Sequence, residues 1–482
     1  MSTMILAILP EILLLVLAVM VLLLDAVWKR EQRRRIGWIT AAGLVIIAVV
    51  SIFAARPGAE SELLWGGMIR HDWLSFIFKM LFLFAGAATV LLAMDVQNLG
   101  ERGEFYVLML ASIIGMNFMA SATNLIMLYL AIETTSIPLY ILAGFMTRDE
   151  KSTESGFKYL LFGALSSTVM LYGFSLLFGF TGTTDLAQLA SVVTAGEVPL
   201  GALIGSLGLI MVGFAFKISA FPFHFWAPDV YEGAPTPVAG FLSTASKAAG
   251  FAVLVRFFMT TFPGDDIMPF WVGIITVISV LTMTFGNAVA LAQKNIKRML
   301  AYSSIAHAGY ALIGVVAFSE FGLGSVVYYL FAYVLTNLAA FGVVVIYWRI
   351  VCSDDISSYA GLSRRSPGLA LAMLVAFLSL AGMPPLGGFV AKVFVFAAAV
   401  QSNLIWLAFV GVLNSIVGLY YYLTVLKVVY LYRSEDENKP LPVTRSQTIA
   451  LAVLCAGIIV VGTVFGPWFG LSSAAASAIF HF

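Results

Sequence analysis

The chain has 482 residues and a net charge of +1, and 61% of its residues are hydrophobic while only 11% are charged. Soluble proteins carry about 25% charged residues, so this composition excludes an ordinary soluble domain and indicates a protein embedded in lipid. The two cysteines and four histidines form no metal-binding or redox motif, and no nucleotide-binding glycine motif is present. We therefore expect no redox cofactor or nucleotide bound by this chain alone.

Fourteen apolar segments of roughly 20 residues, the length that crosses about 30 Å of hydrocarbon, follow one another along the chain. The sequence thus predicts an all-α polytopic membrane protein. The basic cluster of the first segment follows it, which is typical of a retained helix and not of a cleavable signal peptide. The expected transmembrane helices are residues 4–24, 36–55, 74–94, 105–122, 124–146, 157–180, 200–220, 236–258, 268–291, 299–318, 322–349, 368–400, 404–432 and 446–468.

Two of these helices are expected to be broken. Pro222 follows Lys217 at the end of helix seven, and a Gly382-to-Gly388 run with two prolines interrupts helix twelve before Lys392. Proline removes a backbone donor, and a broken helix persists in a membrane only where protein or a wet cavity satisfies the freed groups. The breaks lie five helices apart, and repeats of an odd number of helices must be inverted relative to each other.

The expected organisation therefore has four parts. Three N-terminal helices precede two inverted five-helix repeats, and a polar loop with a final helix follows them. The parts span residues 1–104, 105–260, 261–433 and 434–482. Seventeen lysines and arginines fall in the loops of one side, against Arg56, Arg70 and Arg256 on the other. By the positive-inside rule, and with an even helix count, both termini are expected on the non-cytoplasmic side.

Four ionisable residues inside the expected helices are the main candidates, because each charge costs about 2.5–3.5 kcal/mol at the bilayer centre. Glu133 lies in helix five, and Lys217 is its natural partner. Lys247 lies among small residues in STASKAAG, and Lys392 follows the second break. The structural alternatives are a glutamate hydrogen-bonded to Ser or Thr and lysines that extend to the membrane surface. Ionisable residues inside a membrane helix, however, usually mark an ion or proton path.

Three further residues are weaker candidates for the same path. Lys158 opens helix six near the membrane edge, where extension to the surface explains it equally well. His224 follows the first break and His307 lies inside helix ten. Imidazole titrates nearest physiological pH, although a helical histidine is often only a satisfied polar group. Together the residues favour proton or cation translocation, and no nucleophile–base constellation suggests a hydrolase or transferase.

Three stretches carry a family resemblance: FKISAFPFHFWAPDVYEGAPTP, STASKAAG and KRMLAYSSIAHAGY. They resemble the antiporter-like membrane subunits of respiratory complex I and of multisubunit cation/proton antiporters, over nearly the whole chain. The opening LPEILLLVLAVMVLLLD, an end after about fourteen helices and Lys392 in helix twelve are similar to the N-type branch of that family.

The resemblance implies a proton-translocating subunit of an NADH:quinone oxidoreductase in a bacterial cytoplasmic membrane, beside other antiporter-like and small membrane subunits. NADH, FMN, iron–sulfur clusters and quinone would be bound by partner subunits, and no nucleic acid is implied. The alternatives are a subunit of a cation(Na⁺)/proton antiporter, or a membrane scaffold whose charges no longer conduct. The path residues implied are Glu133, Lys217, Lys247, Lys392, His224, His307 and Lys158.

Overall fold

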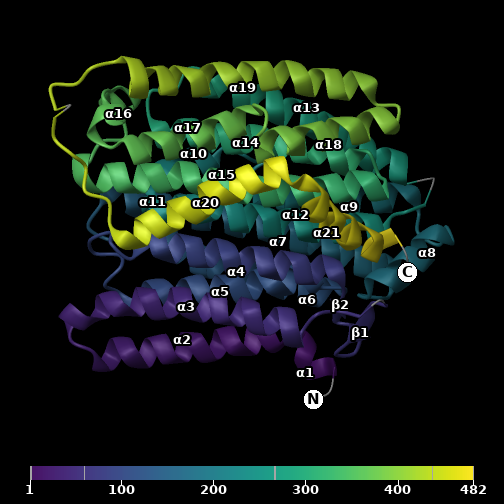
Figure 1. Ribbon diagram of the computed structural model, residues 1–482. Coiled ribbons are helices and arrows are strands. Elements are labelled where there is room, and N and C mark those ends of the chain that lie inside the picture. The colour runs from purple at the N-terminus through teal and green to yellow at the C-terminus, as the bar shows by residue number, and fades with distance from the viewer. Residues whose placement is uncertain (1–2, 59, 265–266, 437, 481–482) are drawn as a thin grey trace.

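The computed structural model describes residues 3–58, 60–264, 267–436 and 438–480 as a bundle of roughly parallel helices (Figure 1). The long elements are α2 (Leu9–Val27), α3 (Arg30–Ala54), α4 (Trp73–Ala93), α5 (Gly103–Ser121), α6 (Leu125–Ala143), α7 (Glu150–Thr181), α9 (Leu200–Lys217), α12 (Lys247–Thr261), α13 (Met268–Ala290), α14 (Ile296–Val316), α15 (Glu320–Val351), α17 (Pro367–Ala381), α18 (Gly387–Gln401), α19 (Ile405–Leu431), α20 (Arg445–Thr463) and α21 (Phe465–Phe480). The short ones are α1 (Thr3–Ala7), β1 (Glu62–Leu64), β2 (Ile69–His71), α8 (Leu186–Thr194), α10 (Trp226–Gly233), α11 (Thr236–Phe241), the π-helix η1 (Leu242–Ser246), the 3₁₀-helix η2 (Ile356–Tyr359) and α16 (Leu362–Arg365).

The predicted transmembrane pattern is confirmed. Thirteen helices of the described residues are long and apolar enough to cross a membrane, with residues 236–261 counted as one. The fourteenth expected segment is the pair α17 and α18, which are separated at the predicted Gly-Pro run. The break in helix seven is confirmed as well, because α9 ends at Lys217 and α10 begins only at Trp226.

The sequence pattern did not predict the short elements between the spans. Antiparallel strands β1 and β2 and the helix α8 lie at one end of the bundle (Figure 1). The last expected helix is in fact two, α20 and α21, because Val464 adopts a non-helical conformation (φ −115°, ψ 59°). Pro467 stands in the first turn of α21, where the missing backbone donor costs no helical bond.

Two matching connections show the inverted repeat. Asn124 caps the start of α6 and bridges to Asp185 after α7, while Asn295 caps the start of α14 and bridges to Asp355 after α15. Each asparagine side chain accepts a hydrogen bond from a backbone N–H of the first helical turn, which satisfies a donor that the helix cannot. Asp185 adjoins α8, whereas Asp355 adjoins η2 and α16, at the opposite end of the bundle (Figure 1).

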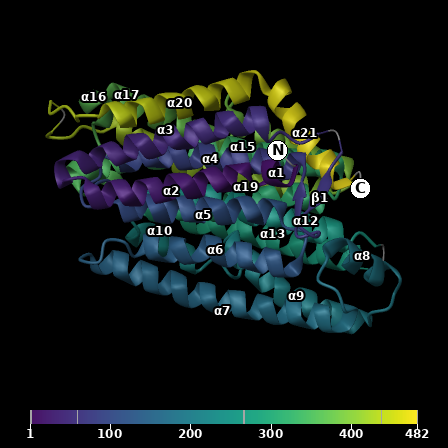
Figure 2. The same ribbon diagram turned by 90° about the horizontal axis from the view of Figure 1, so that it is seen from below.

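The C-terminal pair contacts both the N-terminal helices and the second repeat. α20 and α21 both pack against α4 and against α15, and Figure 2 shows α20 on the face opposite α7. We call the end of the bundle with α16 and the α2–α3 connection the basic side. α1, the β-strands, α8 and the end of α21 lie at the other end (Figure 1), so the first and last described helices reach the same side, as expected.

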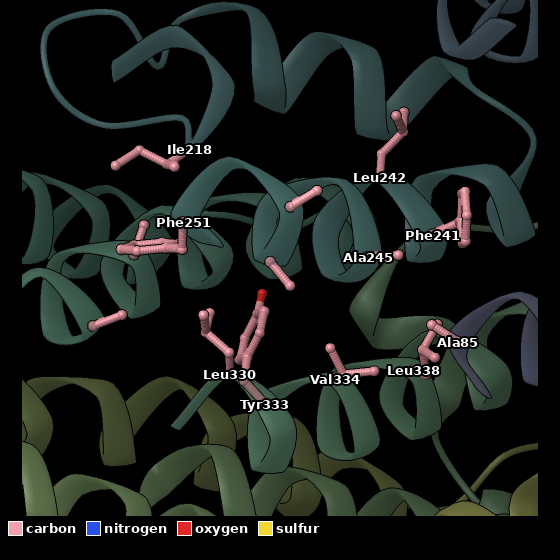
Figure 3. Packing of buried hydrophobic residues seen from close by; sticks show 14 of the residues in the cluster. Ala85, Ile218, Phe241, Leu242, Ala245, Phe251, Leu330, Tyr333, Val334 and Leu338 are labelled. Carbon is pink, nitrogen blue, oxygen red and sulfur yellow. The ribbon is translucent and has the colours of Figure 1, made fainter. Parts of the chain in front are cut away.

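Apolar side chains fill the space between the helices that carry the candidate residues. Figure 3 shows Leu242 and Ala245 of η1 on one side and Val334 and Leu338 of α15 on the other. All four are buried in the main hydrophobic cluster. The buried ionisable residues of the candidate site lie among these apolar side chains.

Candidate functional site

Lys217 is the last residue of α9 and is only 5% exposed. Its Nζ donates a hydrogen bond to Ser136 Oγ on α6. Glu133 lies three residues before Ser136, on the same helical face. Within the described residues, Ser136 and not Glu133 contacts Lys217, so the direct ion pair that the sequence suggested is not formed. The two charges still attract each other through space.

His224 lies in the break that follows, and its surroundings are aromatic. The ring is stacked on Phe221 at 5.4 Å and lies 4.7 Å from the ring of Phe285. Its Nδ1 atom is buried without a hydrogen-bond partner among the residues that the structure describes. The structure therefore places His224 at the broken helix, as predicted, but joins it to no lysine in the described chain.

Lys247 follows the π-helix η1, whose wider turn precedes the lysine directly. The side chain is 2% exposed and crosses to α14, where Nζ donates to the Ser304 carbonyl at 2.7 Å and to Ser304 Oγ at 2.6 Å. Ser304 lies one turn before His307 on α14. Lys247 of α12 therefore contacts α14 one turn before His307.

His307 is held by tyrosines from two other helices. Its Nδ1 is 2.7 Å from Tyr329 Oη on α15, and its Nε2 is 3.3 Å from Tyr422 Oη on α19. The ring also stacks on Tyr333 with centroids 5.0 Å apart. Both ring nitrogens therefore have hydroxyl partners that donate or accept according to the tautomer.

Lys392 on α18 turns back to the end of α17. Its Nζ donates to the carbonyls of Leu380 and Ala381, at 2.9 and 3.0 Å, and to Ser415 Oγ at 2.8 Å. The last carbonyls of a helix lack internal partners and carry its partial negative charge. The broken helix therefore supplies the acceptors that hold the buried lysine.

A small cavity of about 10 Å³ lies between His307 and this break. That is close to the volume needed for one water molecule. Five of its lining residues have polar side chains, but the surface that they and their neighbours present to the cavity is mostly apolar. The lining residues are His307, Tyr329, Tyr333, Thr336, Ser379, Leu380, Gly388 and Ala391.

Lys158 belongs to a different environment. It is one third exposed, and its Nζ lies 2.7 Å from both Glu154 and Asp229 carboxylates. Asp229 also pairs with Arg298 at 2.8 Å, and Arg298 reaches Glu232 at 3.0 Å. Asp229 and Glu232 thus tie α10 to α7 and α14. Lys158 lies in this ion-pair cluster at the basic side.

Beyond this cluster, Lys297 pairs with Asp354 at 3.1 Å in the connection after α15. Burial raises the pKa of the Asp354 carboxyl above its usual value, and the charge of Lys297 only partly offsets that effect. These contacts fasten the loops of the second repeat to α14.

Two buried ion pairs at the other side were not predicted. Lys79 of α4 is 2.8 Å from Glu11 of α2, and each side chain is 4% exposed. Arg256 forms two hydrogen bonds with Asp72, at 2.8 and 2.9 Å, and was counted among the loop residues although it lies inside α12. A lysine within residues 74–94 was the available signal for the first pair.

The comparisons with known proteins agree with the arrangement. A family model described as NADH:quinone oxidoreductase/Mrp antiporter, TM, matches residues 122–418. NADH-quinone oxidoreductase subunit N of Moorella thermoacetica is 44% identical over 94% of each chain. NAD(P)H-quinone oxidoreductase subunit 2 of Trichormus variabilis is 39% identical, over 97% of this chain and 92% of that protein.

Solved structures share the fold. A chain of respiratory complex I from Thermus thermophilus is 32% identical, with a TM-score of 0.80 over 96% of this chain and 99% of that one. A chain of the Mrp complex from Dietzia sp. DQ12-45-1b has a TM-score of 0.87 over 99% and 98%, at 20% identity, which shows the fold alone. From the matched family model, the identity and coverage of the relatives and the shared fold, the chain belongs to the antiporter-like membrane subunit family of NADH:quinone oxidoreductases and Mrp antiporters, on the subunit N branch.

Proposed function

We propose that this chain is a proton-translocating membrane subunit of an NADH:quinone oxidoreductase. The observation that carries the proposal is the way Lys217, Lys247 and Lys392 are held. All three are nearly inaccessible to solvent, and their ammonium groups donate to hydroxyl and carbonyl oxygens. Acceptors of this kind solvate a proton carrier without fixing a full negative charge beside it.

The proposed path follows the contacts along the two repeats. Glu133 acts on Lys217 through space, so that a change in the charge of Glu133 changes the electrostatic potential at the Lys217 ammonium group. From Lys217 the proton passes to Lys247, then by Ser304 and His307 toward Lys392. The small cavity between His307 and the α17–α18 break has room for a water molecule on this route.

We assign the remaining candidates to the ends of this path. Lys158 lies in the partly exposed cluster at the basic side, a suitable position for proton uptake. His224 stands at the break of helix seven, where a free Nδ1 within the described structure leaves it available to a water molecule. Residues 105–260 and 261–433 would then each contribute one half-channel, flanked by the N-terminal helices (1–104) and the C-terminal part (434–482).

The same proposal includes the orientation of the chain in the membrane and the location of the redox cofactors. The basic side would face the cytoplasm of a bacterium, which places both termini on the non-cytoplasmic side. NADH, FMN, iron–sulfur clusters and quinone would be bound by partner subunits, and this chain would contain no redox site. The relatives named as quinone oxidoreductase subunits support this assignment over a cation(Na⁺)/proton antiporter.

The test is a Lys247→Ala variant of the complex reconstituted in vesicles, with Lys427→Ala as its control. Lys427 is an exposed lysine of α19 that lies outside the proposed proton path. Proton uptake per NADH oxidised is expected to fall in Lys247→Ala and to stay at the wild-type level in Lys427→Ala. NADH oxidation by an artificial acceptor reports assembly of the redox subunits. A fully assembled Lys247→Ala complex that pumps normally refutes the path, and Na⁺-driven proton flux without NADH oxidation would assign the chain to the antiporters.

A further inference from the structure

A second cavity lies outside the proton path, at the basic side between α3 and α20. Its volume is about 640 Å³. Both helices pack against α4, and Figure 2 shows α3 and α20 along the same region of the bundle. The residues that supply its polar and aromatic lining are Arg34, Arg35, Trp38, Asp95, Arg445 and Ser446.

The only carboxylate among those lining residues is already compensated. Asp95 forms an ion pair with Arg34 and accepts hydrogen bonds from the hydroxyls of Thr444 and Ser446. Burial alone raises the pKa of the Asp95 carboxyl, but these hydrogen bonds and the charge of Arg34 bring that pKa below its usual value. Asp95 is thus a fixed anion that positions Arg34 and the start of α20.

The cavity therefore carries an excess of positive charge. Three arginines face one aspartate in its lining, and Arg445 is the first residue of α20, where a helix carries partial positive charge. Ser446, at the same helix end, donates its hydroxyl to Asp95. Guanidinium groups match the geometry of phosphate oxygens, so the chemistry of the cavity fits a phosphate group.

The surfaces next to the cavity are apolar. Val45 of α3 is 54% exposed and Val453 of α20 is 50% exposed, and exposed apolar residues continue along both helices away from the arginines. Trp38 is 41% exposed in the cavity itself, and tryptophan is enriched at the level of lipid headgroups. A phosphate site that opens onto apolar helix faces has the shape of a lipid and not of a soluble anion.

We propose that this cavity binds the headgroup of an anionic phospholipid, whose acyl chains lie along α3 and α20. Arg35 and Arg445 contact the phosphate, Arg34 is held in place by Asp95, and Trp38 packs at the glycerol level. Basic pockets between transmembrane helices recognise anionic headgroups in this way. The lipid would join the N-terminal helices to the C-terminal pair, two parts that both rest on α4.

The test compares complexes that carry wild-type chain, Arg35→Gln/Arg445→Gln, or the control Arg433→Gln, an exposed arginine of the loop after α19. Each complex is depleted of lipid and titrated with phosphatidylglycerol or phosphatidylcholine, and bound lipid is counted by native mass spectrometry. Each arginine removed is expected to weaken phosphatidylglycerol binding roughly fivefold, because one basic residue contributes about 1 kcal/mol near an anionic lipid. The control retains wild-type binding. Equal binding of both lipids, or no loss in the double variant, overturns the proposal.

A photo-crosslinking residue at Ile449, which also lines the cavity, separates a lipid from a protein occupant. Irradiation of the native membrane is expected to give an adduct of phospholipid mass on this chain. An adduct with a neighbouring subunit instead shows that protein covers the cavity and refutes the lipid site.

Discussion

Individual buried charges in this protein are of two kinds. Arg256 and Asp72 form a bidentate ion pair, and Lys79 and Glu11 form a second pair on the N-terminal helices. Lys217, Lys247 and Lys392 instead donate to neutral oxygens. A neighbouring carboxylate stabilises the protonated form of a basic side chain and so disfavours release of its proton. Neutral oxygen acceptors stabilise the cation without adding that negative charge. The first kind fastens helices, and the second kind is suited to proton transfer.

Removal of one partner of the Lys79–Glu11 pair should be strongly destabilising. Lys79→Ala leaves a buried carboxylate without its partner, and such losses cost about 3–5 kcal/mol. The Glu11→Leu/Lys79→Met double variant removes both charges and should recover most of that stability. Thermal unfolding of the detergent-solubilised complex measures the difference. If the single and double variants melt together below the wild type, the pair does not have this fastening role.

The tyrosines around His307 should matter through a single hydroxyl. Tyr329→Phe removes the partner of His307 Nδ1 and keeps the ring. Tyr328→Phe is a matched control on the same helix, because its hydroxyl donates to the Val461 carbonyl. We expect slower proton translocation and a changed pH profile in Tyr329→Phe alone, measured as uptake per NADH oxidised. Equal effects of both variants would show that the hydroxyl has no specific role in the path.

At the scale of the element, the two broken helices organise the site. α17 ends where Gly382 takes a left-handed conformation (φ +87°), and its last carbonyls accept from Lys392. α18 begins beside the same turn, with the N–H of Gly388 donating to Ser379 Oγ at 3.0 Å. The break, the lysine and the small cavity therefore depend on a close approach of two backbones.

Gly388 is the residue that permits this approach. A Cβ added there would meet the Ser379 carbonyl oxygen at 1.9 Å, so Gly388→Ala must displace α18 from α17. Overpacking of this kind costs about 1–3 kcal/mol or more, and we expect loss of proton translocation with reduced thermal stability. Gly368→Ala, at the start of α17, meets no atom within 4 Å and is the control. Normal pumping by Gly388→Ala would contradict the close packing.

The breaks and the buried lysines could be predicted from the sequence. Each places a proline or a charged side chain inside an apolar segment, where it is energetically costly and stands out from its neighbours. The sequence did not predict their partners. Ser136 is 81 residues from Lys217, and Ser304 is 57 residues from Lys247. Serine is common and inexpensive inside a membrane helix, so no local signal distinguishes these two. Glu133 was chosen as the partner of Lys217 by charge alone, and only the rotation of α6 decides that Ser136 makes the contact.

At the scale of the whole molecule, the inverted repeat brings equivalent connections to opposite ends. Asn124 and Asp185 are 61 residues apart and lie at the end with α8, while Asn295 and Asp355 are 60 apart and lie at the basic side. The helix break therefore occurs at the same place in the helix order of each repeat, but the two repeats cross the membrane in opposite directions. If the proposed path runs through both repeats, one half-channel would open to each side of the membrane, as net transport requires.

The proposed orientation, with the basic side facing the cytoplasm, predicts which exposed residues are accessible from each side of the membrane. Cys352 is an exposed native thiol at the C-terminal end of α15, on the basic side. We expect a membrane-impermeant maleimide to label it in inverted vesicles, where the cytoplasmic face is outside, and not in right-side-out vesicles. Ser191→Cys in a Cys352→Ser background is the control, because Ser191 is exposed on α8 at the other end. It should show the reverse pattern. Labelling of Cys352 in right-side-out vesicles would show that the assigned orientation of the bundle is reversed. The direction in which protons enter each repeat would then be reversed as well.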